Sequence, residues 1–138
     1  MIVAGLTNSF KEQLLLGVHD FSTDVMKIAL YTEDAILSPD TTVYSSDNEV
    51  SSAGYTQGGQ ILLNVTVNLQ NGIAYVSFDD PTWNATTFTT RGALIYISSK
   101  ADKSVAVLNF GLNQTTLSQQ FQIQLPPDNP DSALIRVT

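Results

Sequence analysis

Hydrophobic and polar residues alternate along most of this chain, and a period of two is typical of β-strands that bury one face. The clearest alternation covers residues 61–69, where every odd position carries Ile, Leu or Val. We predict a strand there whose odd-numbered side chains belong to the core, and we predict the same for the apolar positions of 121–125. The other predicted strands cover residues 25–31, 73–78, 86–90, 93–98, 105–110, 120–125 and 133–137.

Two tight turns separate pairs of these strands. Asn71-Gly72 favours a two-residue hairpin turn, because such a turn needs a positive φ at both positions. Counting outward from the turn places Val67 opposite Val76, so the turn and the hydrophobic pattern set the same register. A short polar connection at residues 101–103 predicts a second hairpin between the strands on either side of it.

The N-terminal residues follow a helical pattern instead. Ser9 and Glu12 have the spacing of a capping box, and we predict a short helix over residues 8–16. A helix of this length is marginal alone and must pack on something. We therefore divide the chain into an N-terminal arm or short helix, 1–20, and a β-sandwich domain, 21–138.

We expect this arm to contribute to assembly more than to the fold of its own subunit. Large apolar groups left over in a monomer usually mark an interface. The alternative is a helix that closes the end of its own sandwich. The candidate interface residues are Leu6, Phe10, Leu14 and Leu15.

About eight short strands separated by turns predict an all-β fold, an antiparallel β-sandwich of jelly-roll-like type preceded by the short helix or arm. The length of 138 residues suits one domain with a hydrophobic core. Thirteen acidic and six basic residues give a net charge of −7, which argues against nucleic acid as a partner. No apolar run reaches the ~20 residues of a membrane-spanning helix, and we expect neither a secretion signal nor a membrane partner.

Few residues offer reactive chemistry. The chain has no Cys, which excludes disulfides and thiol catalysis, and it has a single histidine, His19. Asp79-Asp80 could bind Ca²⁺, but neighbouring strand residues point to opposite faces, and a turn that caps the backbone before Pro81 is the better interpretation. His19-Asp20 lacks an evident third member for a catalytic triad, and we interpret His19 as a surface or hinge residue. We expect no enzymatic activity, no cofactor and no metal.

Trp83 and the tyrosines could form a platform on which sugars stack. An aromatic side chain in a sandwich is more often a core or interface anchor, so both interpretations of Trp83 stay open. A glycan-binding module is therefore one candidate function, with Trp83 as the candidate stacking residue.

A series of short motifs occurs in a distinctive order along most of the chain, and the part from Gln120 onward is the least distinctive. They cover residues 8–11, 17–21, 27–31, 35–37, 41–44, 49–50, 54–59, 78–83, 88–96 and 105–111. In this order the chain resembles small virion structural proteins of capsid cement or decoration type, encoded near the head genes of tailed bacteriophages. Ser52 stands where that family often has Gly, so the turn there is expected to differ.

The resemblance implies a β-sandwich protein that binds the outer face of an icosahedral capsid and reinforces it. It further implies the major capsid protein as partner, a homotrimer, synthesis in the cytoplasm of the bacterial host, and a final location on the outer capsid surface. It transfers no catalytic residue. The alternative is a tail-associated structural protein, such as a tailspike, fibre or baseplate domain, which could bind a host surface glycan.

Overall fold

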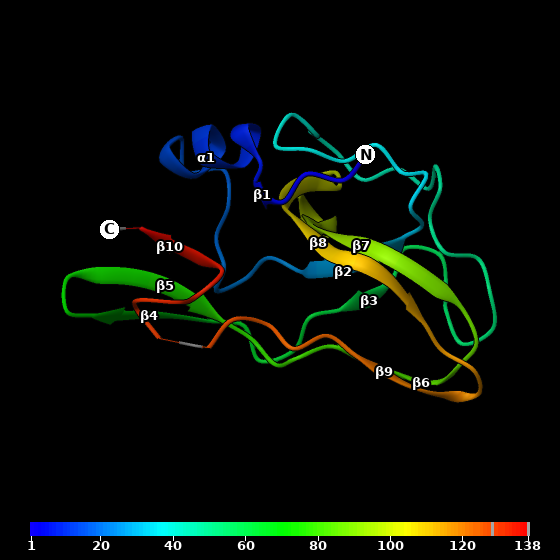
Figure 1. Cartoon of the computed structure of the whole chain (residues 1–138). Coiled ribbons are helices and arrows are strands. Elements are labelled where there is room, and N and C mark those ends of the chain that lie inside the picture. The colour runs from blue at the N-terminus through cyan, green and yellow to red at the C-terminus, as the bar shows by residue number, and fades with distance from the viewer. Residues whose placement is uncertain (128, 138) are drawn as a thin grey trace.

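The computed structural model describes residues 1–127 and 129–137 and contains one α-helix, one 3₁₀ helix and ten strands. A five-stranded antiparallel sheet has the order β1-β8-β7-β2-β3. In Figure 1 a three-stranded sheet (β10-β5-β4) lies to the left of it, and a two-stranded sheet (β6-β9) lies below it. The predicted all-β, antiparallel, sandwich-like fold is confirmed. The elements are β1 (Gly5–Leu6), α1 (Asn8–Leu15), β2 (Met26–Tyr31), β3 (Gln60–Ile61), β4 (Thr66–Gln70), β5 (Ile73–Ser77), β6 (Thr82–Thr86), β7 (Thr89–Ile97), η1 (Ser98–Lys100), β8 (Lys103–Thr115), β9 (Gln119–Gln122) and β10 (Ile135–Val137).

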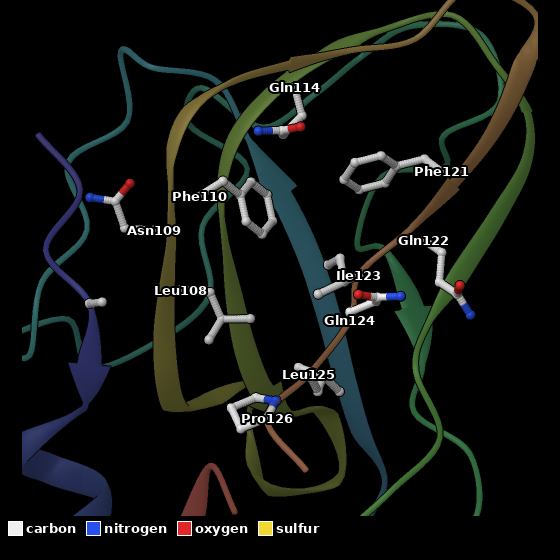
Figure 2. A pocket seen from close by; sticks show the side chains of 11 residues that line it. Leu108, Asn109, Phe110, Gln114, Phe121, Gln122, Ile123, Gln124, Leu125 and Pro126 are labelled. Atoms are coloured by element: carbon white, nitrogen blue, oxygen red, sulfur yellow. The ribbon is translucent and has the colours of Figure 1, made fainter. Parts of the chain in front are cut away.

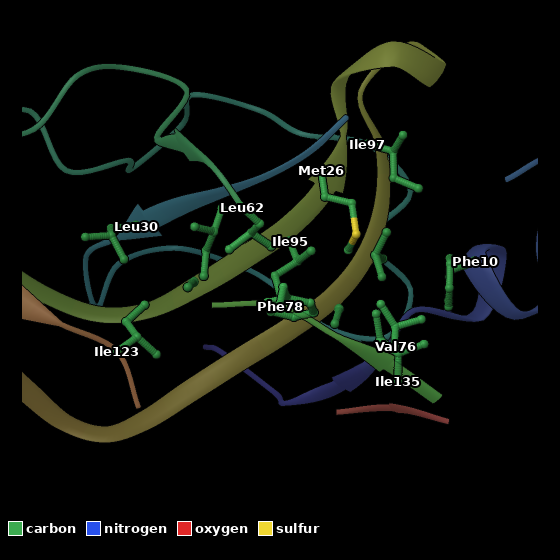
Figure 3. Packing of buried hydrophobic residues seen from close by; sticks show 14 of the residues in the cluster. Phe10, Met26, Leu30, Leu62, Val76, Phe78, Ile95, Ile97, Ile123 and Ile135 are labelled. Carbon is green, nitrogen blue, oxygen red and sulfur yellow. The ribbon is translucent and has the colours of Figure 1, made fainter. Parts of the chain in front are cut away.

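The main core lies between the five-stranded sheet and the smaller sheets. Alternate residues of β2, Met26, Ile28 and Leu30, are almost completely buried there, as the period of two predicts. Figure 3 shows Phe10 of α1 at the same end of this cluster as Val76 and Ile135. The helix therefore closes one end of the core of its own chain.

The opposite face of the five-stranded sheet is also covered. Ala29 and Tyr31 of β2 are buried in a second cluster together with Leu94 and Val107. This cluster is completed by the N-terminal residue Ile2 and by the long connection between β2 and β3, residues 32–59, which supplies Ala35, Leu37 and Tyr44. β2 and β7 are consequently buried on both faces, which an alternating pattern alone does not predict.

The Asn71-Gly72 hairpin is confirmed. Asn71 and Gly72 have φ values of 54° and 77°, and Val67 pairs with Val76 as the turn requires. The second predicted hairpin is confirmed as well, since β7 pairs with β8 through a connection in which Ala101 and Asp102 both have positive φ. The conformation of each turn is determined by the two or three residues that form it.

Replacing Gly72 with valine should destabilise this hairpin. A Cβ at position 72 would meet nothing within 4 Å, so the cost comes only from the φ of 77°. A β-branched residue in that region costs about 1–2 kcal/mol. Equilibrium urea unfolding followed by circular dichroism measures the loss, and an unchanged free energy of unfolding would contradict the assigned turn.

The predicted strand over 61–69 is wrong in one respect, because it is two strands with a break between them. Asn64 adopts a φ of 56°, which turns the chain between β3 and β4. Leu62, predicted to face outward, is 4% exposed, whereas Ile61 and Leu63 are 53% and 63% exposed. Of the odd-numbered stripe only Val65 packs against the core, and its residues on β4, Val67 and Leu69, are exposed. The prediction that the apolar positions of 121–125 belong to the core is confirmed, because Ile123 is buried and Phe121 and Leu125 pack against the core.

Other element boundaries also differ from the prediction. The predicted strand 86–90 contains the break between β6 and β7, and β1 and β6 were not predicted as strands. β8 runs on to Thr115, well past the predicted end at residue 110. The register between β7 and β8 shifts at two places along the pair, at residues 90–92 and 95–96 of β7.

Candidate functional site

The four candidate interface residues of the N-terminal segment fall into two groups. Phe10 has no exposed surface, and its ring lies 5.6 Å from His19 and 5.9 Å from Phe21, centroid to centroid. Leu6 and Leu14 are partly buried against the same core, whereas Leu15 is 90% exposed. The expectation that Phe10 forms an interface is therefore wrong, because the chain's own core encloses it. Leu15, with Leu16 beside it at 70% exposed, remains available to a partner.

The rest of the segment is held by its own subunit and does not extend as an arm. β1 pairs with β8 through Leu6 and Ala106. The N-terminal ammonium donates a 2.9 Å hydrogen bond to the carbonyl of Ala35. The hydroxyl of Ser104 donates to that of Thr7 over 2.9 Å in a completely buried contact. The alternative, a helix that closes its own sandwich, describes Phe10 correctly.

Trp83 is not a platform for sugars. Its side chain is 6% exposed and lies between the rings of Tyr55 and Phe121, at centroid distances of 6.4 and 5.9 Å. The interpretation of Trp83 as a core anchor is confirmed. A sugar could stack on this indole only if the surrounding aromatic cluster opened.

A groove lies instead between β8 and the segment formed by β9 and the residues after it. It has a volume of about 390 Å³, and Figure 2 shows Leu108 and Phe110 of β8 facing Phe121, Ile123 and Leu125 across it. The rings of Phe110 and Phe121 meet edge to face, 6.2 Å apart. The polar part of the lining consists of the amide side chains Asn109, Gln114, Gln122 and Gln124. Among the residues that the structure describes, none of those lining the groove is charged. An apolar floor with amide hydrogen-bonding groups suits an uncharged ligand such as a sugar.

A buried carboxylate organises the connection between β2 and β3. Glu49 is 8% exposed and accepts hydrogen bonds from the hydroxyls of Tyr44 (2.6 Å) and Tyr55 and from the backbone N–H of Gly58 (2.8 Å). Three donors satisfy a carboxylate that burial would otherwise penalise. The opposite end of this network is fixed by Tyr96, whose hydroxyl donates to the carbonyl of Gly58 over 2.6 Å.

The tyrosines of this network stay protonated at physiological pH. Burial, and next the hydrogen bond to Glu49, raises the pKa of Tyr44 and that of Tyr55 well above the usual value. Burial and then the charge of Asp102 raise the pKa of Tyr96 to about 12. Each hydroxyl is consequently a hydrogen-bond donor at physiological pH. We call Glu49, Tyr44, Tyr55, Gly58 and Tyr96 the clasp, because their hydrogen bonds hold the connection 32–59 in place.

His19 is buried, at 8% exposed, so its interpretation as a surface or hinge residue is wrong. Its Nε2 lies 2.9 Å from the amide oxygen of Gln13, and its ring stacks on Phe10. Burial lowers the pKa of His19, which favours the neutral imidazole. The side chain therefore fills the space beneath α1, and the nearby helix explains its burial.

Asp79 and Asp80 serve different neighbours. Asp79 accepts a hydrogen bond from the side-chain amide of Asn64, and Asp80 accepts one from the backbone N–H of Leu125. These contacts are not those of the predicted turn that caps the backbone before Pro81, because the partner of each carboxylate lies on a distant segment of the chain. Within residues 1–127 and 129–137, no group of three acidic or histidine side chains has the arrangement of a metal site.

The exposed apolar side chains gather most clearly on the β4–β5 hairpin and the adjacent β10. Val67 and Leu69 of β4 are 59% and 76% exposed, and Val137 of β10 is 54% exposed. The pairings Leu69–Ala74 and Ala74–Val137 put Leu69 and Val137 in one row, and Val67 lies in the next row of the same face, opposite Val76. We call Val67, Leu69, Ala74 and Val137 the hairpin patch. The sequence signal for it is a stretch without charged residues, which extends from Val50 to Phe78.

Comparisons with models of protein families, with curated proteins and with solved structures gave no match to this chain. No helix in the part of the chain that the structure describes has the length and apolar character needed to cross a bilayer.

Proposed function

We propose that this protein is a structural component of the virion of a tailed bacteriophage, a cement or decoration protein that binds the outer face of the icosahedral capsid. Its partner is the major capsid protein, and it acts as a homotrimer without catalytic activity. The order of motifs that resembles the cement and decoration proteins supports this proposal.

The single observation that carries the proposal is the distribution of exposed aliphatic side chains over separate elements. Leu15 lies on α1, Ile36 on the connection between β2 and β3, Leu69 on β4 and Leu117 after β8, and each is at least 74% exposed. One exposed leucine is ordinary on a soluble protein, but the hairpin patch adds a contiguous apolar face. Several apolar contact points on one small domain suit a subunit that touches more than one neighbour.

The rigidity of the fold also supports a reinforcing role. Strands β2 and β7 of the five-stranded sheet are buried on both faces, and the hydrogen bonds to Glu49 hold the connection 32–59 that covers one of these faces. A cement protein gains by presenting a surface that is already ordered, because binding then loses little conformational entropy.

The second candidate is a tail-associated structural protein, and the groove between β8 and β9 is the observation that favours it. Its aromatic floor and amide lining have the chemistry of a glycan site, and tail proteins of phages contact host surfaces.

Copy number separates the two candidates. In purified virions, quantitative mass spectrometry against the major capsid protein should give hundreds of copies, and cryo-electron microscopy should place the chain on the outer shell. The purified protein should also bind capsids that lack it. A few to a few tens of copies at the tail would contradict capsid decoration and support the second candidate, and absence from virions would contradict both.

A further inference from the structure

The outer edge of β4 has the hydrogen-bonding groups of an unfinished sheet. β4 is the last strand in the order β10-β5-β4, and a two-residue turn joins it to β5. In such a hairpin the pair closing the turn is hydrogen bonded and the pairs then alternate. The N–H and C=O groups of Val67 and Leu69 therefore point away from β5. Within residues 1–127 and 129–137, no backbone hydrogen bond reaches them.

This edge also lacks the features that normally keep sheet edges apart. Exposed edge strands are usually protected by charged side chains, proline or a bulge. β4 has none of these: its sequence is Thr-Val-Asn-Leu-Gln, and its register with β5 is regular. The two side chains that flank the edge on the apolar face, Val67 and Leu69, are both more than half exposed. The edge is therefore complementary to another uncharged strand with an apolar face.

Charge identifies a second copy of this chain as the partner strand. The chain has a net charge of −7, so two copies repel each other over most of their surfaces. No charged residue lies between Glu49 and Asp79, and β4 is in the middle of that stretch. Two copies can meet at β4 without bringing acidic side chains together.

We propose that β4 pairs antiparallel with β4 of a second copy, so that two three-stranded sheets become one six-stranded sheet. The register that pairs the whole strand puts Asn68 opposite Asn68 of the second copy, on a two-fold axis. Val67 of each copy then exchanges two backbone hydrogen bonds with Leu69 of the other. The two hairpin patches become one continuous apolar face. The contact is isologous, and each subunit supplies the same groups.

This inference deepens the proposed function, on which it rests for its biological role: a two-fold contact would connect neighbouring subunits, or neighbouring trimers, across the capsid surface. The three-fold contact of the proposed homotrimer would use a different part of the molecule. Pairing at β4 can be tested on the isolated chain, without a capsid.

Single-cysteine cross-linking tests the register, and the chain supports it because it has no Cys of its own. In the proposed pairing, Asn68→Cys places two thiols at a non-hydrogen-bonded position with Cα atoms about 4.5 Å apart, within disulfide range. Thr66→Cys is the matched control on the same strand and the same face, because its two thiols would be about 13 Å apart along the strands. Mild oxidation should give a covalent dimer of N68C and leave T66C uncross-linked.

Light scattering coupled to size exclusion tests the association itself. Val67→Lys should raise the dissociation constant of the pair by at least roughly tenfold, because it brings two like charges together at the two-fold contact. Leu112→Lys is the matched control, since Leu112 is 72% exposed and lies on β8 of the five-stranded sheet, and its replacement changes the charge equally. Leu69→Pro removes only an outward N–H and should also abolish pairing without breaking the hairpin.

Equal cross-linking of N68C and T66C, or no cross-linking of N68C, would overturn the pairing. Equal effects of V67K and L112K on the dissociation constant would overturn it as well. If L69P does not fold, the cysteine pair still decides the outcome. Capsid binding separates this inference from the proposed function. A chain that does not pair at β4 but binds capsids overturns only the pairing, and a chain that pairs but never binds virions overturns only the function.

Discussion

Replacing Gly59 with alanine should prevent the chain from folding to its native state. A Cβ at this position would lie 1.7 Å from the carbonyl oxygen of Ile28 and 2.8 Å from Cα of Ala29. Both are backbone atoms of β2, which pairs with β7 on one side and with β3 on the other, so neither can move aside without breaking the sheet. The φ of +78° adds strain of its own. We expect a loss of at least about 4 kcal/mol, which is exceptional for a single substitution.

Gly17→Ala is the matched control. Gly17 has a similar φ of +72°, but an added Cβ would meet nothing within 4 Å. Only the backbone strain applies there, at about 1–2 kcal/mol. Urea unfolding followed by circular dichroism compares the two variants. Equal losses would show that the contact between position 59 and β2 does not exist.

Replacing Phe10 with alanine should destabilise the isolated subunit by about 3–5 kcal/mol, the usual cost of removing a buried aromatic ring. The ring has no exposed surface and packs against His19 and Phe21. The same reasoning applies to removal of residues 1–20, which would also delete β1 from the sheet and should unfold the chain. Free energies of unfolding from urea titrations, at a concentration where the chain is monomeric, measure the effect.

Leu15→Ala provides the control on the same helix. Leu15 is 90% exposed, so its truncation should change stability by less than about 0.5 kcal/mol. If Phe10→Ala is equally silent in the monomer and instead weakens assembly, the N-terminal segment is an arm after all.

The sequence predicts what is local in this fold. The Asn71-Gly72 turn and its register follow from backbone geometry at two residues and agree with the structure pair by pair. The burial of Met26, Ile28 and Leu30 follows equally well, because β2 is a regular strand with a neighbouring strand on each side.

Alternation shows which residues share a face, but it does not show what covers that face. For this reason the stripe at 61–69 was assigned to the core, although Val67 and Leu69 lie on a hairpin that extends beyond the five-stranded sheet (Figure 1). Asn64 could have signalled the break, since Asn tolerates a positive φ better than most residues. The burial of Trp83 depends on Tyr55 and Phe121, which are distant in sequence, and no local pattern specifies them.

The connection 32–59 covers one face of the five-stranded sheet, and its exposed residues can differ in sequence without a change in the sheet beneath it. Its inward side chains, Leu37 and Tyr44, join the second core cluster, and the clasp at Glu49 holds its path from within. Its outward positions, such as Ile36 at 85% exposed, contribute little to that path. Substitutions can therefore change the outer surface of this connection while the sheet beneath it continues to fold unaltered.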